Sequence, residues 1–395
     1  MIDKQKIIII GAGLGGLAAA ACLIMDGHDV EVYEQAPPLG EVGAGIQISA
    51  NAMHVLNHIG VGQDLGQTAV RPVAYTFCMG DTGEIIQSFE LSGAHERAHG
   101  APYYHVHRAD IHDLLAARVL ELKPGSIHVD HRLTSYEETG DGVTAVFANG
   151  VHASGDLLVG ADGLKSAVRE HMLGKQNPVY TGDVAWRIVV PTKKVEGLMP
   201  RIEQRLWMMP GGHAVTYFLR RGELINFVGL IEKDKPEEES WTTKHSWDEL
   251  KADFEGWHPI IQGLIDHADK DACYLWALHI REPIEGWSTK RVTMLGDAVH
   301  ATLPYLAQGA AMAFEDGAVL TRALREAHDL PSALDLYQRN RYERTARVVR
   351  ESSANGKLFH HRSREAMLEA FRNRDMGKER SMWLFNYNPW TVELV

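Results

Sequence analysis

Cysteine is scarce in this 395-residue chain, which has only Cys22, Cys78 and Cys273. The three are odd in number, far apart and in no CxxC arrangement. Neither a disulfide framework nor a cysteine-based zinc site is therefore expected. A reducing compartment, the cytoplasm, fits this usage best.

The chain also lacks an excess of positive charge. Its 40 Lys and Arg side chains are outnumbered by 52 Asp and Glu side chains, which gives a formal net charge of -12. Such a balance repels a phosphate backbone, so no nucleic-acid partner is expected. Hydrophobic residues make up 45% and charged residues 23% of the chain, as in ordinary globular proteins. At roughly 150 residues per domain, the length predicts two or three domains.

A long uninterrupted hydrophobic run is missing as well. Residues 7–25 carry no charged side chain, but four glycines interrupt this stretch in its middle. An export signal or a membrane-spanning helix favours continuous Leu, Ile and Ala instead. No membrane association is therefore expected.

The same stretch has the pattern of a strand, a tight turn and a helix. The β-branched run Ile7–Ile10 is followed by a GxGxxG turn and then by helix-forming residues. In such a turn Gly11 allows the tight bend, Gly13 lets a pyrophosphate approach the backbone, and Gly16 permits close packing of helix on sheet. Together with Gly15, these glycines predict a phosphate-binding helix N-terminus.

A second strand, Val30–Tyr33, ends in Glu34, 21 positions after Gly13. A carboxylate at this place can accept hydrogen bonds from ribose hydroxyls. The strand, glycine turn, helix, strand and acid together predict a site for a dinucleotide that contains adenosine, either NAD(P) or FAD.

Two later segments place an aspartate directly after a short apolar strand. Asp162 belongs to a GADG turn that follows Leu157–Val159, and Asp297 follows the run at 292–295. Ligands of open α/β sheets bind at the carboxyl ends of the strands. Both aspartates are therefore expected near the dinucleotide.

These motifs together resemble the FAD-dependent aromatic hydroxylases, single-component flavoprotein monooxygenases of the para-hydroxybenzoate hydroxylase fold. The resemblance spans residues 1 to about 350, and its motifs stand in the family's order. They are the glycine turn with Glu34, His107-Arg108-Ala109-Asp110, GADG at 160–163 and GDAVHATLPYLAQGAAMAFED at 296–316. The chain is most similar to the salicylate hydroxylase and 6-hydroxynicotinate 3-monooxygenase branch, including Val184-Ala185-Trp186-Arg187 and Asn388-Pro389-Trp390.

The resemblance implies an α/β (α+β) fold. A Rossmann-like FAD-binding domain is expected to be discontinuous, built from residues 1–70, 100–175 and 290–350. A β-sheet substrate domain is expected from 71–99 and 176–289, and a C-terminal helical segment from 351–395. Alternating apolar and polar runs at 178–232 independently predict antiparallel strands, followed by a charged loop at 233–240.

The pattern from residue 332 onward is helical. It carries arginines at 339, 341, 344, 347 and 350, interleaved with Glu343 and Glu351. In an acidic protein this spacing indicates a solvated helix face rather than a nucleic-acid surface.

The resemblance also implies a set of cofactor-binding residues. Arg108 is expected near the linker phosphates or the ribityl chain, and Asp297 at the ribityl hydroxyls. Asp162 either contacts the cofactor or only fixes its own turn. The residues expected to bind FAD are Gly11, Gly13, Gly15, Gly16, Glu34, Gln47, Arg108, Asp162, Asp297, Gly309 and Ala310.

Substrate-side residues are expected on a strand, because His213 and Tyr217 are four positions apart and so share one face. By resemblance they face the substrate, with Pro304 and Tyr305 on a loop beside the flavin. The residues expected to bind substrate are Gln47, Arg187, His213, Tyr217 and Tyr305, and those expected to be catalytic are His213, Tyr217, Pro304 and Tyr305.

Two departures from the 6-hydroxynicotinate enzymes leave the substrate open. Gln47 and Tyr305 each stand where those enzymes have a histidine, and glutamine cannot act as a base. The pair Pro304-Tyr305 is more similar to the salicylate hydroxylases.

The implied activity is that of an FAD-dependent monooxygenase that takes electrons from NADH or NADPH. It would hydroxylate a small hydroxylated aromatic or heteroaromatic acid, such as a hydroxybenzoate or hydroxynicotinate, through a flavin hydroperoxide formed with dioxygen. Carboxylate loss would follow attack on the carbon that carries it. Two alternatives stay open: an FAD-dependent reductase or dehydrogenase without oxygen insertion, and a flavin-binding regulator without turnover.

No metal site is expected. The pair His54 and His58 has helical i, i+4 spacing but lacks an accompanying HExxH acid, and the pair His360-His361 is interpreted in the same way. A monomer and a homodimer are equally compatible with the sequence.

Overall fold

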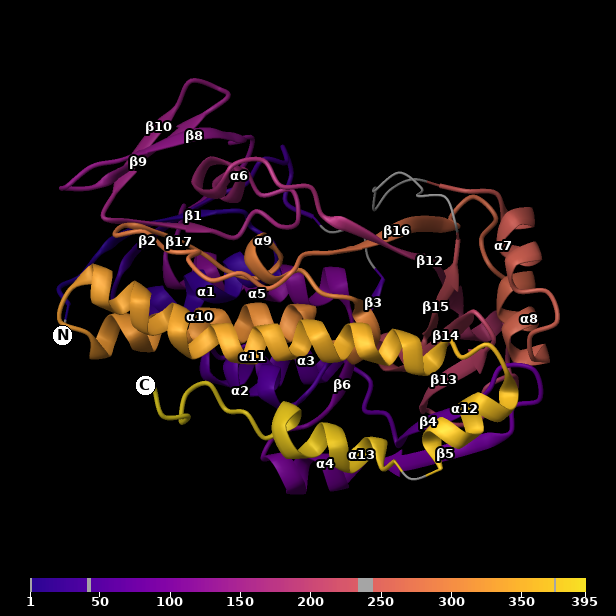
Figure 1. Cartoon of the computed structure of the whole chain (residues 1–395). Coiled ribbons are helices and arrows are strands. Elements are labelled where there is room, and N and C mark those ends of the chain that lie inside the picture. The colour runs from indigo at the N-terminus through magenta and orange to yellow at the C-terminus, as the bar shows by residue number, and fades with distance from the viewer. Residues whose placement is uncertain (1, 41–43, 234–243, 373) are drawn as a thin grey trace.

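A parallel sheet forms the part of the molecule that contains the N-terminus (Figure 1). The computed structural model describes residues 2–40, 44–233, 244–372 and 374–395, so most of the charged loop expected at 233–240 lies outside the described residues. In spatial order the five strands are β17 (Val292–Met294), β11 (Leu157–Gly160), β1 (Lys6–Ile10), β2 (Asp29–Tyr33) and β7 (Ile127–His128).

The centre of this sheet is β1, whose isoleucines 7–10 are buried. In a strand that is covered on both faces, every side chain is buried and therefore apolar, which explains the four consecutive isoleucines. Strand order reverses between β1 and its neighbour β11, since later strands are added on the two opposite sides. Such a switch point opens a crevice at the carboxyl ends of the strands, where nucleotides bind in open α/β sheets.

A mixed seven-stranded sheet forms the other large layer, at the right of Figure 1. Only the pairing of β13 with β4 is parallel; the other neighbours are antiparallel. In spatial order its strands are β16 (Tyr274–Ile280), β12 (Val179–Pro191), β15 (Leu224–Glu232), β14 (Gly212–Leu219), β13 (Gln204–Met209), β4 (Ala74–Met79) and β5 (Ile85–Glu90).

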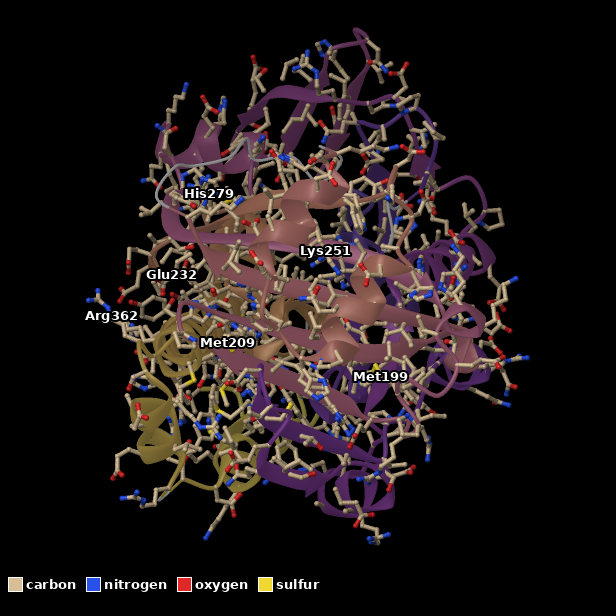
Figure 2. All side chains as sticks on the ribbon, turned by 90° about the vertical axis from the view of Figure 1, so that its right-hand side faces the viewer. Met199, Met209, Glu232, Lys251, His279 and Arg362 are labelled. Atoms are coloured by element: carbon tan, nitrogen blue, oxygen red, sulfur yellow. The ribbon has the colours of Figure 1, made fainter. Side chains whose placement is uncertain are left out.

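One face of this sheet is covered by α7 (Trp247–Asp253) and α8 (Pro259–Asp266). Figure 2 looks onto these two helices, with Lys251 of α7 in front. Trp186 lies in the apolar core beneath them and donates a hydrogen bond from Nε1 to Asp253, 2.7 Å away. Trp186 is therefore a core residue of the sheet.

Smaller elements complete the fold. A three-stranded antiparallel sheet consists of β10 (His152–Gly155), β9 (Val143–Phe147) and β8 (Leu133–Glu138). A two-stranded sheet consists of β3 (Gly45–Ile48) and β6 (Tyr104–His107). The remaining helices are α1 (Leu14–Met25), α2 (Ala50–His58), α3 (Gly62–Thr68), α4 (Ser92–His99), α5 (Arg108–Leu122), α6 (Ala167–Leu173), α9 (Asp297–His300), α10 (Gly309–Glu326), α11 (Leu330–Phe359), α12 (Arg364–Phe371) and α13 (Met376–Arg380). Single turns are η1 (Thr192–Lys194), η2 (Arg220–Gly222), η3 (Pro304–Leu306) and η4 (Ser381–Phe385).

The 30-residue helix α11 runs along the molecule from the parallel sheet to the seven-stranded sheet (Figure 1). The expectation of a solvated helix is wrong for part of it. Arg339 and Arg347 are half exposed, but the Arg341 side chain has no exposed surface and Arg344 is nearly buried. The buried arginines pair with Glu315 and Asp316 of α10. The sequence of α11 alone does not reveal these partners.

The fold is therefore α/β (α+β), with a parallel nucleotide-type sheet, a second large sheet and C-terminal helices. Cys22, Cys78 and Cys273 are all buried and free. Among the helices that the structure describes, none has the length and apolar character needed to span a lipid bilayer.

Candidate active site

A cavity of about 280 Å³ lies between the carboxyl ends of the parallel sheet and one face of the seven-stranded sheet. It brings together residues that are far apart in the sequence. The expected site residues that line it are Gly13, Gly15, Gln47, Arg108, Arg187, His213, Tyr217, Asp297, Pro304, Tyr305, Gly309 and Ala310.

The glycines of the turn after β1 have two different roles: some allow close packing, and one leaves open space beside the backbone. Gly11 has a φ of +106°, in the region that favours glycine, and a Cβ atom at Gly16 would overlap the carbonyl oxygen of Gly11. A Cβ atom at Gly13 would meet no protein atom within 4 Å. Gly11 and Gly16 thus shape the turn, while Gly13 presents bare backbone to the cavity.

Glu34 holds this turn from the neighbouring strand. Its carboxylate accepts hydrogen bonds from the backbone N–H groups of Ala12 and Ala36, at 2.8 and 2.9 Å. Each carboxylate oxygen can accept a further bond. The expected contact of Glu34 with a ribose stays a prediction, because Glu34 does not belong to the cavity lining described above.

Asp162 also serves its own turn. Its carboxylate accepts hydrogen bonds from the Ser166 hydroxyl at 2.5 Å and from the N–H groups of Ala167 and Val168 at 2.7 and 3.1 Å. Of the two sequence interpretations of Asp162, this geometry favours the fixing of the turn. Its neighbours Ala161 and Gly163 line the cavity instead.

Asp297 follows β17 and lines the cavity, as does Arg108 of α5. Gly296 makes the bend before it with a φ of +59°. Although Asp297 is open to the cavity, desolvation by the surrounding protein raises the pKa of its carboxyl, against the opposing effect of His300 and Arg108. The carboxylate is thus held at the strand end where ligands of such sheets bind.

Behind Asp297 a buried ion-pair network joins α10 to α11. Arg341 donates to Asp316 from Nε at 2.7 Å and to Glu315 from Nη2 at 2.8 Å. Asp316 also accepts hydrogen bonds from the N–H of Gly296 at 2.9 Å and from His300 Nε2 at 2.6 Å. The network therefore fixes the turn that positions Asp297.

His213 and Tyr217 lie on β14 and both line the cavity, as strand spacing predicts. Burial and the nearby His360 hold the pKa of His213 well below its ordinary value, so the imidazole is neutral at neutral pH. Burial raises the pKa of Tyr217, so its hydroxyl keeps its proton. The site thus offers a neutral base and a phenolic donor on one sheet face.

Arg187 of β12 brings a positive charge to the same cavity. Its guanidinium carbon lies 4.1 Å from the ring centroid of Trp276. Burial lowers the pKa of Arg187 to about 10, which leaves it charged at neutral pH. A partly buried guanidinium that lines a cavity is a suitable partner for a carboxylate.

The loop Pro304–Gly309 closes the cavity opposite His213. Tyr305 is buried, and its ring centroid lies 5.1 Å from that of His213. Its hydroxyl donates a 2.5 Å hydrogen bond to Asp183 Oδ2. A Cβ atom at Gly356 of α11 would come within 2.6 Å of the Tyr305 ring, so the helix packs directly on this tyrosine.

Gln47 lies on β3 at the cavity edge, and its Oε1 accepts a 2.7 Å hydrogen bond from the Tyr103 hydroxyl.

Three candidate functional residues were not predicted from the sequence: Asp183, His360 and Arg380. Asp183 directly precedes the Val184–Arg187 motif, and His360 was considered only as a metal ligand. No pattern in the sequence singles out Arg380, which lines the cavity from α13.

The residues present fit FAD. Bare backbone at Gly13 and at Gly309, where an added Cβ atom would meet only Thr302 at 4.0 Å, leaves room for close approach of a ligand. The N-termini of α1 and α10 bring backbone donors and a positive dipole end to the cavity, as a pyrophosphate and a reduced flavin require. Arg108 and Asp297 add a cation and an acceptor.

Comparison with known proteins gives concordant results. The family described as "FAD binding domain" matches residues 4–352. The chain is 36% identical to a 6-hydroxynicotinate 3-monooxygenase of Pseudomonas fluorescens, over 100% of this chain and 98% of that protein. It is 37% identical to a 3-hydroxybenzoate 6-hydroxylase of Polaromonas naphthalenivorans (strain CJ2), over 97% and 96% of the two chains.

Solved structures agree. Klebsiella pneumoniae HpxO, complexed with FAD and uric acid, superposes with a TM-score of 0.83 at 27% identity, over 96% of this chain and 95% of that one. A salicylate hydroxylase substrate complex shares the fold, with a TM-score of 0.83 at 23% identity over 98% and 96% of the chains.

The fold and the cavity define a flavoprotein aromatic hydroxylase. The chain belongs to the FAD-binding-domain family, and it is an FAD-dependent aromatic monooxygenase, an oxidoreductase. Monooxygenases of this kind take their electrons from NADH or NADPH. The relatives' activities disfavour a reductase or dehydrogenase without oxygen insertion.

Replacement of Gly13 by valine is expected to weaken FAD binding without unfolding the protein. The new side chain would enter space that no protein atom occupies, where the pyrophosphate is expected. We expect the Kd for FAD to rise at least about tenfold, equivalent to about 1.4 kcal/mol. Fluorescence titration with FAD measures the Kd, and thermal unfolding of the FAD-free protein measures stability.

Gly40→Val is the matched control, because a Cβ atom at Gly40 also meets no atom of the described residues within 4 Å but Gly40 does not line the cavity. Unchanged FAD affinity in Gly13→Val would contradict the assignment of the phosphate site.

Proposed function

We propose that this monooxygenase hydroxylates a small aromatic or heteroaromatic acid that already carries a ring hydroxyl, with NADH or NADPH as electron donor. Hydroxybenzoates and hydroxynicotinates are the compounds of this class that the relatives' names contain. Where the attacked carbon carries the carboxylate, hydroxylation would release it.

One observation carries this proposal: a neutral base and a partly buried cation lie in the same cavity. His213 and Arg187 both line it, on adjacent parts of one sheet face. A hydroxylated aromatic acid has a proton for the base and a carboxylate for the cation. A purely hydrocarbon substrate would offer neither a proton for His213 nor an acceptor for the Arg187 guanidinium.

The ring hydroxyl is the group on which His213 acts. Removal of its proton makes the ring electron-rich, and so more reactive towards an electrophilic oxygen. His213 Nδ1 is engaged with His360, so Nε2 is the nitrogen left to accept the proton. Tyr217, which keeps its own proton, is placed to donate a hydrogen bond to the resulting phenolate.

The remaining groups orient the substrate and exclude water. Arg187 would hold the carboxylate, because a guanidinium forms two parallel hydrogen bonds with it. Pro304 and the buried Tyr305 and Leu306 cover the cavity on the side of α10. Leu206, Val215, Val228 and Leu230 add apolar surface from the sheet. FAD, when bound, supplies the chemistry that activates dioxygen.

Anaerobic flavin reduction by NADH and NADPH, followed by stopped-flow absorbance, tests the proposal. The assay is run without ligand and with salicylate, 3-hydroxybenzoate or 6-hydroxynicotinate. We expect one such acid to accelerate flavin bleaching by orders of magnitude. Under an atmosphere of ¹⁸O₂ in place of air, the product of that acid is expected to contain one labelled oxygen atom.

The same assay separates the alternatives. Fast reduction without any acid, and no labelled product, would favour a dehydrogenase. Purified protein without a flavin spectrum, even after incubation with FAD, would contradict the whole assignment.

A further inference from the structure

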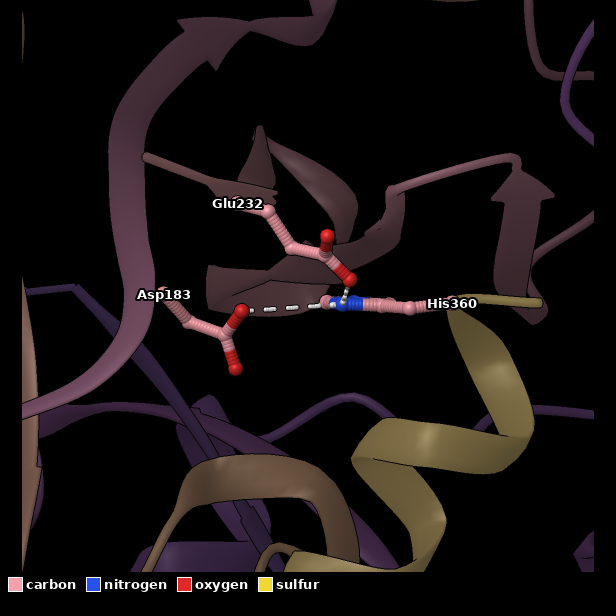
Figure 3. A group of neighbouring side chains, drawn as sticks. All are labelled: Asp183, Glu232 and His360. Atoms are coloured by element: carbon pink, nitrogen blue, oxygen red, sulfur yellow. Dashed lines mark ion pairs between the residues drawn. The ribbon is translucent and has the colours of Figure 1, made fainter. Parts of the chain in front are cut away.

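His213 is in contact with a second histidine outside the cavity. Its Nδ1 lies 2.7 Å from Nε2 of His360, the residue directly after α11. The other ring nitrogen of His360, Nδ1, lies 3.6 Å from Asp183 Oδ1 and 3.5 Å from Glu232 Oε1 (Figure 3). The four side chains thus form a continuous series that starts at the substrate cavity.

This series ends at a second, larger cavity of about 850 Å³ that opens to solvent. Asp183, Glu232 and His360 line it, and Tyr305 lies between the two cavities because it lines both. Exposure rises along the series: His213 is 1% exposed and His360 8%, whereas the Glu232 side chain is 59% exposed. Glu232 lies at the edge of the molecule in Figure 2.

A buried base needs such a route. With flavin and substrate bound, the substrate cavity excludes water, so a proton accepted by His213 has no direct path to solvent. Burial and the neighbouring imidazole disfavour the charged form of His213, which therefore cannot store the proton. Burial also lowers the pKa of His360, to about 4, so the outer ring is neutral as well.

We propose that His360, Asp183 and Glu232 carry the substrate's phenolic proton from His213 to the solvent in the second cavity. This inference rests on the proposed function. The substrate O–H bond breaks and its proton binds His213 Nε2, while the proton on His213 Nδ1 moves to His360 Nε2. The proton on His360 Nδ1 then moves to Asp183 or Glu232 and on to water.

The balance is one proton in and one proton out, with no change in oxidation state. The same steps in reverse return a proton to the phenolate and restore both imidazole tautomers. Tyr305 orients the outer acceptor, because its hydroxyl donates to Asp183 Oδ2 and leaves Oδ1 towards His360. Among the described residues, the other ionisable side chains that line the second cavity are Tyr180, Lys233, Lys357, His361 and Arg362.

Replacement of His360 tests the route. In FAD-loaded His360→Gln, product formation from salicylate, 3-hydroxybenzoate and 6-hydroxynicotinate is expected to slow about 10- to 100-fold. FAD affinity and KM are expected to stay unchanged, because His360 does not line the substrate cavity. In His360→Ala, imidazole added to the buffer can enter through the second cavity and is expected to restore much of the rate.

His361→Gln is the matched control, because His361 lines the same second cavity but has no place in the series. Its rate is expected to equal that of the wild type. Glu232→Gln tests the outer end with an exposed residue and is expected to give a smaller decrease. It also keeps the proposal testable if the His360 variants fail to bind FAD.

Two kinds of result would overturn the relay alone, and one would overturn the proposed function as well. A wild-type rate in His360→Gln, or a loss in His360→Ala that imidazole does not reverse, would overturn the relay alone. Loss of rate in the wild type after dialysis against EDTA would assign Asp183, Glu232 and His360 to a cation and overturn it too. No turnover of any hydroxylated aromatic acid by the wild type would overturn the proposed function and the relay with it.

Discussion

Replacement of Arg341 by methionine is expected to lower the free energy of unfolding by about 3–5 kcal/mol. Methionine keeps most of the volume but removes the positive charge that lies between Glu315 and Asp316. All three side chains have no exposed surface, so the two carboxylates would lose a partner that water cannot replace. Urea unfolding followed by circular dichroism measures the change.

Arg339→Met is the matched control on the same helix. Arg339 pairs with Asp335 at 2.8 Å, but both side chains are more than half exposed. Exposed pairs contribute about 0–1 kcal/mol, so this variant is expected to unfold almost like the wild type. Equal stability losses in the two variants would contradict the central role of the buried network.

The same network predicts a response to acid. Burial alone would raise the pKa of Asp316, but His300 and Arg341 lower it from 3.8 to about 2. Asp316 therefore contributes stability above pH 3.8, and this contribution is lost as the pH falls towards 2. Without Arg341 the pKa rises, so Arg341→Met is expected to unfold at a higher pH in an acid titration.

Replacement of His213 by glutamine is expected to lower the rate of hydroxylation about 10²- to 10⁴-fold, the usual contribution of a general base. Glutamine can keep a hydrogen bond to His360 but cannot accept the substrate's proton. FAD is expected to stay bound, since the glycine turn and Asp297 are untouched. Product formation at saturating acid and NADH gives the rate, and the flavin spectrum gives the occupancy.

The pH dependence offers an independent check on His213. Burial and His360 hold its pKa well below 6.5, so the base is neutral down to a lower pH than a free histidine. The acid limb of kcat is therefore expected below pH 6.5, and it should be absent in His213→Gln. His267→Gln, at the exposed end of α8, serves as the control. A wild-type rate in His213→Gln would remove His213 from the reaction.

The parallel sheet and its ligand edge could be predicted from the sequence because the signals are local. Ile7–Ile10, the glycine turn and Glu34 form one continuous unit, and GADG and Gly296-Asp297 each directly follow a strand. The packing roles of Gly11 and Gly16 follow from the same pattern and are seen in the turn. Local geometry of this kind needs no knowledge of distant contacts.

The second part of the site depends on pairings between distant residues, which one sequence does not reveal. His213 and Tyr217 could be placed on one strand face, but the contact of His213 with His360 joins residues 147 positions apart. Arg341 has the sequence surroundings of a surface residue, and only the packing of α11 on α10 shows that it is buried. Asp183 gains its role from Tyr305, 122 positions away.

Because Gly356 contacts the Tyr305 ring, the residue type tolerated at one of these positions depends on the residue at the other. This dependence applies to natural relatives and to engineered variants. A helix interior normally disfavours glycine by about 0.5–1 kcal/mol relative to alanine, so Gly356 carries a cost that the tyrosine ring explains. An alanine at 356 would come within 2.6 Å of that ring. A larger residue at 356 therefore requires a smaller one at 305, and relatives should show covariation of the two. A mutant library that varies position 305 alone leaves out every combination in which the helix fills the vacated space.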